Sequence, residues 1–352
     1  MTQDISAVNA ASKRIDWIDM AKGIAMVLVV LAHTVSETAA GSITRGVIFS
    51  FHMPLFFILS CTTFKWSSNM QQYISKLKKA AVHLLIPAGV TYVILIIVDC
   101  IRTPSLFVTG NFWLGKLYTL VFASGVSTYY SSLYVEAIGM TWFFLALFIS
   151  RAVFDYLHMV LKDSYLLIVS MIIGICGILI GQYSWLPFSL DIALAIMPFL
   201  YVGCKLCSFK PDSHPLIKLL ICLGSWGLCT YLTFPDAEIW SYLELAIRRY
   251  PMFPLCYIGA IAGTIVLCEL SVIICRLKYI PKPFIFLGRN SLYFFCVHIL
   301  DSIWISWWLV SDNQFLEALI RFLIDLAIFL LFMLARYLFF RIIRSLKARR
   351  AA

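Results

Sequence analysis

Two ionisable residues lie inside the first apolar segment of the chain, and their spacing places them on one helical face. Lys22 and His33 are eleven residues apart in the stretch DMAKGIAMVLVVLAH. Eleven residues turn a helix through about 1100°, so the two side chains lie within about 20° of each other and roughly 16 Å apart along the axis. An ionisable side chain inside a membrane span is costly and usually marks a functional site. Imidazole can act as a general base near neutral pH, and an ammonium group can hold an anion or stabilise negative charge.

Three histidines fall at a similar depth when the apolar segments are counted from their ends. His33 lies late in the first segment, and His52 lies early in the second, which returns from the same membrane face. His298 lies past the middle of a later segment, with Asp301 three residues beyond it on the same helical face. Pro54 follows His52 and interrupts the helical hydrogen-bond ladder, which membrane helices tolerate where the break lines a cavity. The three imidazoles should therefore meet in one layer near the outer side of the membrane.

A purely structural role is the alternative for each of these residues. A histidine in a membrane helix often satisfies an interhelical hydrogen bond, and this explanation suits His298 better than His33. Glu37 lies one turn beyond His33, where it could orient the imidazole or simply lie in solvent at the helix end. Asp191 and Asp325 are further acids in apolar segments, and we expect them to face the bundle interior.

The composition indicates a polytopic membrane protein. Of 352 residues, 62% are hydrophobic and 13% are charged, whereas a typical soluble domain carries about 25% charged residues. The net charge of +10 would suggest nucleic acid only if the basic residues clustered on a soluble face. They lie instead in short connections between apolar segments, so we expect no nucleic-acid partner. Residues 1–17 are too polar to form a signal-peptide core, and the first apolar segment should therefore remain as an anchor.

Ten segments are long and apolar enough to cross the hydrocarbon core as helices. They are 18–38, 43–64, 80–101, 138–158, 164–181, 188–206, 216–234, 251–274, 285–308 and 315–340. Connections rich in Lys and Arg alternate with poorer ones, so the positive-inside rule places both termini in the cytoplasm. We therefore predict an all-α integral membrane protein of about ten transmembrane helices, forming one domain over residues 1–352. Residues 1–17 would form a cytoplasmic N-terminal segment, and the basic residues 341–352 a cytoplasmic tail near the inner leaflet.

The longest connection on the predicted outer side covers residues 103–137 and is rich in aromatic residues. Its apolar part, 112–125, is short for a span and should lie at the interface or re-enter the membrane. The aromatic rings would either anchor the loop at the interface or form a platform on which sugar rings stack.

The cysteines predict neither a metal site nor a disulfide framework. Nearly all eleven lie within apolar segments, where a thiol packs as a small apolar group. Cys204 and Cys207 form a lone CxxC without a second pair or neighbouring histidines, so we expect no metal to be bound there.

Three stretches of the chain resemble motifs of one enzyme family. DMAKGIAMVLVVLAHT, SFHMPLFFILS and LGRNSLYFFCVHI resemble, in this order, motifs of the membrane-bound acyltransferase 3 family, particularly its branch of fucose O-acetylase-like enzymes of surface polysaccharides. The resemblance covers nearly the whole chain. Such proteins move an acyl group, usually acetyl, from cytoplasmic acyl-CoA to a sugar hydroxyl at the outer face of the cytoplasmic membrane. The resemblance thus implies a multi-pass protein of the bacterial inner membrane, with acetyl-CoA as donor co-substrate and no tightly bound cofactor.

The resemblance extends to individual residues. His33 matches the family's essential histidine, Lys22 the basic position before it, and Asp19 the acid that precedes both. The second and third motifs match at His52, Pro54, Phe56, Gly288, Ser291 and His298. The chain departs from the family where Cys61 replaces a glycine. It also departs before Pro87, where Ala80 and His83, with Lys79 adjacent, replace an Arg-x-x-Arg pair of many members.

We expect His33 to deprotonate the acceptor hydroxyl, while Lys22 anchors the donor or stabilises charge. His52 and His298 would position or polarise the reacting groups, and an acyl-histidine intermediate is a further possibility. The expected contacts to the acyl-CoA phosphates are Lys22, Lys76, Lys78 and Lys79. The expected contacts to the acceptor are Asp19, Glu37, Glu136, Trp142 and Ser291. A membrane-embedded site favours a lipid-linked glycan as acceptor, in contact with membrane lipids.

Two other functions compete with acyl transfer. A proton-coupled secondary transporter would use the histidines and acids as a proton relay. Transporters often carry broken helices at matching positions of two halves, and no such pairing is evident in the sequence. A catalytically silent scaffold for glycan assembly is the third candidate, and in it Lys22 and His33 would be dispensable.

Overall fold

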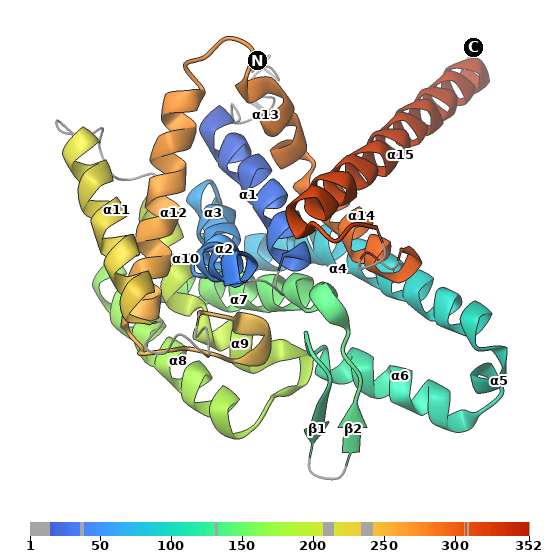
Figure 1. Cartoon of the computed structure of the whole chain (residues 1–352), viewed down its shortest axis with the longest axis horizontal. Helices are drawn as coiled ribbons and strands as arrows, with labels where there is room; N and C mark the ends of the chain where they lie inside the picture. The colour runs from blue at the N-terminus through green and yellow to red at the C-terminus, as the bar shows by residue number, and fades with distance from the viewer. Residues whose placement is uncertain are drawn as a thin grey trace, which may run out of the picture.

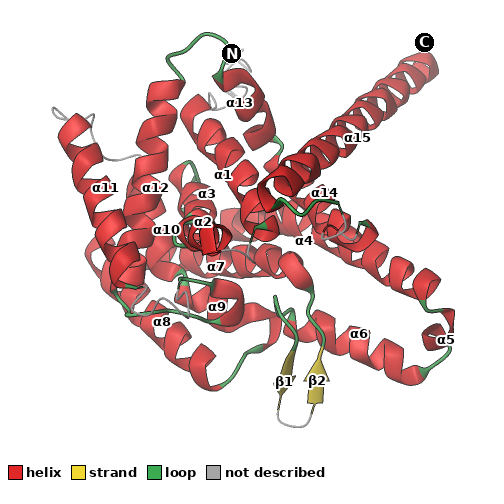
Figure 2. Ribbon diagram, in the orientation of Figure 1, coloured by secondary structure: helices red, strands yellow, loops and turns green. Residues whose placement is uncertain are grey.

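The computed structural model describes residues 15–35, 39–130, 133–206, 215–233, 242–305, 307 and 310–351. Over these residues the chain forms a bundle of helices with one short β-hairpin (Figures 1 and 2). Seven helical segments are long and apolar enough to span a membrane, and two bent helix pairs would raise the number to nine. A further apolar helix, Leu216–Leu232, is slightly shorter. The chain is therefore an all-α membrane protein, as the composition predicts.

The elements follow one another with short connections. The helices are α1 (Asp16–Thr34), α2 (Ala39–Phe49), α3 (His52–Thr62), α4 (Met70–Arg102), α5 (Pro104–Phe107), α6 (Gly110–Phe122), α7 (Trp142–Val160), α8 (Asp163–Tyr183), α9 (Leu190–Ala195), α10 (Met197–Leu206), α11 (Pro215–Leu232), α12 (Leu255–Ile274), α13 (Pro281–Arg289), α14 (Ser291–Trp304) and α15 (Gln314–Ala351). The strands are β1 (Thr128–Tyr130) and β2 (Leu133–Val135).

Several predicted spans are divided in the structure. The predicted segment 43–64 consists of α2 and α3, which meet at Ser50 and Phe51. Pro54 therefore lies in the first turn of α3, where its missing N–H disrupts no helical hydrogen bond. The predicted segment 188–206 bends by 55° between α9 and α10.

The single span predicted at 285–308 is wrong in its geometry. The helix axis turns by 79° between α13 and α14, and Asn290 lies at the bend. This turn lets α13 lie along α1 while α14 enters the bundle (Figure 1).

Helix α1 lies inside the bundle and packs against α2, α3, α12, α13, α14 and α15. Its contact with α13 is an approach of two backbones. A Cβ atom at Gly288 would overlap the carbonyl oxygen of Asp19, and a Cβ atom at Gly23 would overlap that of Phe284. Small residues allow such close packing between membrane helices, where van der Waals contact drives association. The two glycines thus fix the position of the helix that carries Lys22 and His33.

An ion-pair cluster strengthens the same contact. The Arg289 guanidinium donates to Asp16 at 2.7 Å and to Asp19 at 3.1 Å. It therefore joins the end of α13 to the first turn of α1.

The connection between α4 and α7 is mostly ordered into short elements. Helix α6 covers most of the predicted interfacial stretch 112–125, and the antiparallel hairpin pairs Tyr129 with Tyr134. Figure 1 shows the hairpin beside α6 at the edge of the bundle. The hairpin is a small departure from the expected purely helical fold.

Helix α15 continues through the region predicted to be a separate tail. It runs from Gln314 to Ala351, and its C-terminal part extends clear of the other helices (Figure 1). The basic residues after position 341 therefore lie on an extension of the last helix.

Substituting Gly288 should destabilise the bundle. Gly288→Ala forces α13 away from α1, and overpacking of this kind costs about 1–3 kcal/mol. Thermal unfolding of the purified protein in detergent would measure the effect. Gly89→Ala is the matched control, because no atom lies within 4 Å of a Cβ atom at that position. An equal melting temperature for the two variants would contradict the close contact.

Candidate active site

Two cavities of similar size lie in series between the helices that carry the predicted site residues. The first, which we call the histidine cavity, measures about 450 Å³ and is lined by His33 and His52. The second, the lysine cavity, measures about 440 Å³ and is lined by Lys22. Each reaches the protein surface beside charged and exposed side chains, Glu136 at the first and Lys65 at the second.

The lining residues follow their order along each helix. On α1, Lys22 and Met26 line the lysine cavity, Val29 lines both cavities, and His33 lines the histidine cavity. These positions are spaced by four, three and four residues, which keeps them on one helical face. Helices α3, α4, α7 and α14 divide their residues between the two cavities in the same way. The face predicted from the Lys22–His33 spacing therefore runs along both cavities.

His33 lies in the last turn of α1 and is partly exposed. Its ring centroid lies 5.5 Å from that of Phe49 and 5.9 Å from that of His298. The Phe49 ring in turn lies 4.6 Å from the His52 ring. The structure thus brings the three histidines into one region, as the depth of their segments predicts.

The tautomer of His52 follows from its hydrogen bond. His52 begins α3, and its Nδ1 lies 3.1 Å from the carbonyl oxygen of Ile48. A carbonyl oxygen can only accept, so Nδ1 carries the proton in this bond. In the neutral ring Nε2 then presents a lone pair. His52 can accept a hydrogen bond from a hydroxyl group in the histidine cavity.

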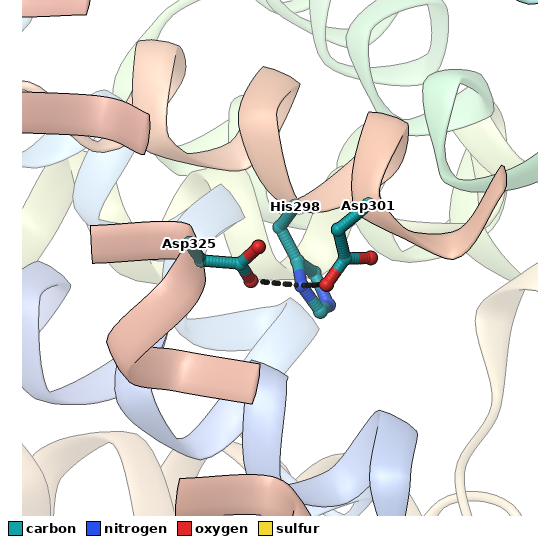
Figure 3. A group of neighbouring side chains, drawn as sticks. All are labelled: His298, Asp301 and Asp325. Carbon is teal, nitrogen blue, oxygen red and sulfur yellow. Dashed lines mark hydrogen bonds and ion pairs between the residues drawn. The ribbon is translucent and has the colours of Figure 1, made fainter. Parts of the chain in front are cut away.

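His298 lies behind His33 and lines neither cavity. It is fully buried between α14 and α15, where Nδ1 lies 2.9 Å from Asp325 and 3.5 Å from Asp301 (Figure 3). Its Nε2 has no hydrogen-bond partner among the residues that the structure describes. The carboxylates fix the ring, and the unpaired nitrogen remains on its other side.

Arg321 connects this group to the helix of His33. It donates to both oxygens of Asp301 at 2.7 Å, and to the carbonyl oxygen of His33 and the hydroxyl of Thr34 at 3.4 Å. The ligand atoms of His298, Asp301 and Asp325 lie close enough to surround a metal ion. However, Arg321 already supplies the positive charge that the Asp301 carboxylate requires.

The charged groups of the histidine cavity are largely paired. Lys116 lies between Asp99 at 2.7 Å and Glu136 at 2.8 Å. Arg45 donates to the hydroxyl of Tyr242 at 2.9 Å and lies 3.9 Å from Glu244.

Glu244 lies in the connection before α12, outside the spans. Burial raises the pKa of its carboxyl, and the nearby Arg45 and Arg249 partly oppose this effect. The cavity therefore offers three carboxylates and two cations held in place by one another, together with the indole of Trp142.

The lysine cavity combines apolar walls with basic groups. Its basic residues are Lys22, Lys65, His83 and Arg151, and its apolar residues include Met26, Phe56, Leu59, Leu84, Phe143, Phe144 and Leu147. The Arg151 guanidinium lies 4.5 Å from the centre of the Phe64 ring. Its Nε is buried without a hydrogen-bond partner among the described residues. This arrangement suits an anion attached to a long, mostly apolar chain.

The other predicted site residues fall into two groups. Glu136 and Trp142 line the histidine cavity, and Ser291 lines the lysine cavity. Asp19 lines neither, because it pairs with Arg289. Glu37 lies outside the described residues, as do residues 1–14 and Cys207.

The lysines expected to hold the donor lie away from the lysine cavity. Lys76 donates to the carbonyl oxygen of Lys65, and Lys78 and Lys79 are exposed on the first turns of α4. Arg151 and Lys65 line the cavity in their place. Arg151 could have been found from the sequence, because it is an ionisable residue inside the predicted segment 138–158.

Breaking the Asp301–Arg321 pair should be more costly than breaking an exposed pair. Arg321→Met leaves a buried carboxylate without its partner, which costs about 3–5 kcal/mol. The double variant Asp301→Leu/Arg321→Met should recover much of this loss. The comparison is Arg289→Met at the partly exposed pair, with a loss of about 1 kcal/mol or less. Thermal unfolding in detergent measures all three. Equal losses in the two single variants would show that the buried pair has no special importance.

Comparison with known proteins identifies the family. The model of the acyltransferase 3 family, described as an acyltransferase domain, matches residues 15–342. No curated protein and no solved structure matches the chain. The matched range contains both cavities and every helix from α1 to α14. The chain therefore belongs to the acyltransferase 3 family and is a multi-pass membrane acyltransferase.

Proposed function

We propose that this protein transfers an acetyl group from cytoplasmic acetyl-CoA to a sugar hydroxyl of a surface polysaccharide or its lipid-linked precursor, in the bacterial inner membrane. The observation that supports this proposal is the pair of cavities in series along α1. Basic groups gather at one cavity and histidines at the other. A donor and an acceptor from opposite sides of the membrane would each have a cavity of their own.

The lysine cavity has the features that acyl-CoA requires. Its phosphates would contact Arg151, Lys65 and Lys22, since guanidinium and ammonium groups bind phosphate through charge-assisted hydrogen bonds. The apolar walls would receive the pantetheine arm. With Lys22 on the cytoplasmic side, as the charge pattern predicts, the thioester would point toward His33.

The histidine cavity has the features that a hydroxyl-rich acceptor requires. Few, fixed polar groups in a pocket orient a ligand and provide its specificity. The paired carboxylates of Asp99, Glu136 and Glu244 can each accept hydrogen bonds from hydroxyl groups, and Trp142 offers an aromatic surface. The paired cations leave no excess of positive charge for an anionic acceptor.

The reaction then proceeds by direct attack of the acceptor oxygen. His33 takes the hydroxyl proton while the oxygen bonds to the carbonyl carbon of the thioester. The carbon–sulfur bond breaks, and CoA leaves as a thiolate that takes the proton from His33. His52 would orient the hydroxyl through its Nε2 lone pair, and His298 would support the His33 ring from behind. The products are an O-acyl sugar and free CoA.

His33 and Lys22 should fail in different ways when substituted. His33→Ala removes the base and should lower the transfer rate by about 10²–10⁴-fold while the donor still binds. Lys22→Ala should mainly raise the KM for acetyl-CoA. The measurements are acetylation of the surface glycan by mass spectrometry and binding of CoA to the purified protein. Full acetylation by a His33→Ala protein that reaches the membrane would refute the catalytic role. Proton-driven uptake without acyl-CoA consumption would support transport instead.

Arg151 should contribute more to donor binding than the exposed lysines of α4. A hydrogen bond to a charged group contributes about 1.5–3 kcal/mol, so Arg151→Gln should weaken CoA binding by about one to two orders of magnitude. Lys78→Gln is the matched control, because Lys78 lines neither cavity. Titration calorimetry in lipid nanodiscs provides the dissociation constants. A larger loss for Lys78→Gln than for Arg151→Gln would restore the donor site predicted from the sequence.

A further inference from the structure

The two cavities meet at a constriction of apolar side chains. Among the described residues, Val29, Met53 and Phe295 alone line both cavities. They come from three different helices, α1, α3 and α14. Val29 is 2% exposed and Phe295 is 8% exposed, so both are packed on their remaining sides. We call these three residues the constriction.

One wall of the constriction is held firmly and another can move. The Phe295 ring packs against Phe143 and Phe144, with centroids 5.8 Å and 5.5 Å away. Met53 is unbranched and partly buried, and methionine adapts to gaps of irregular shape. The opening between the cavities therefore depends mainly on the sizes of Val29 and Met53.

The constriction lies between the predicted donor and the predicted base. On α1, Val29 is seven residues from Lys22 and four from His33, which corresponds to about 10 Å and about 6 Å along the axis. A thioester that enters through the lysine cavity can reach His33 only with its acyl end leading. The acyl group must therefore pass Val29, Met53 and Phe295 before its carbonyl carbon meets the acceptor oxygen.

We propose that the constriction selects the acyl group by size, admitting acetyl and excluding longer acyl chains. This inference rests on the proposed function, because it assumes that acyl-CoA occupies the lysine cavity. A longer chain would have to displace side chains that are already packed, and packed interiors resist added methylene groups. The transferred group is thus chosen by residues that contact neither the CoA phosphates nor the acceptor.

Three methionine variants test this inference. Met53→Ala widens the constriction, Met26→Ala widens only the lysine cavity, and Met140→Ala widens only the histidine cavity. Val29→Ala is a second widening variant in case Met53→Ala folds poorly. Inverted membrane vesicles that contain the endogenous acceptor would receive equal mixtures of acetyl-CoA, butyryl-CoA and hexanoyl-CoA. Mass spectrometry of the glycan then gives the ratio of long to short acyl groups.

The wild-type protein should transfer mainly acetyl groups. Discrimination of one methylene by an apolar site is about 10–200-fold, so Met53→Ala and Val29→Ala should raise the butyryl-to-acetyl ratio by about tenfold or more. The ratio should stay the same in Met26→Ala and Met140→Ala.

Three results would overturn the inference. They are an unchanged ratio in both widening variants that still transfer acetyl, an equal rise in the two control variants, and a wild-type protein that transfers all three chains alike. In each of these cases the proposed acyl transfer would stand. Release of no CoA and transfer of no acyl group by the wild type would refute the proposed function, and the inference with it.

Discussion

A charged side chain inside a membrane must find its partner within the protein, and this constraint organises the bundle. Water and lipid offer no hydrogen bonds at that depth, so unpaired charges there are costly. Asp301 and Arg321 satisfy each other between α14 and α15, and Arg321 also reaches the end of α1. On another side of the molecule Arg248 donates to both oxygens of Asp191 at 2.7 and 3.2 Å and holds the bent α9 in place. These pairs position helices whose apolar surfaces alone would allow many packings.

The pairing around His298 has a consequence for the reaction site. The side chain of His33 is left to face the histidine cavity, while the backbone at its position is held by Arg321 and its ring lies beside His298. A base fixed from behind and open in front is suited to meet a hydroxyl group in a set geometry. The same helix meets α13 through Gly23 and Gly288, so its vertical position in the bundle is determined as well.

The separation of the cavities fits a reaction whose two substrates come from different compartments. A single open channel would join the compartments and allow water to reach the thioester. Two cavities that meet at Val29, Met53 and Phe295 keep polar groups at both ends and apolar groups between them. The acyl group is the one part of either substrate that is small and apolar enough for that middle region.

The sequence alone determined the features that depend on local periodicity. Helical spacing placed Lys22 and His33 on one face, apolar segment lengths predicted a helical membrane protein, and segment depth brought the three histidines together. The tertiary structure alone decided which distant residues meet, because contacts between helices depend on packing and not on spacing along one helix. It replaced Lys78 and Lys79 with Arg151 beside the donor cavity, paired Asp19 with Arg289, and divided the segment 285–308 at a 79° bend. The constriction is the clearest case, since its three side chains come from three helices and share no sequence pattern.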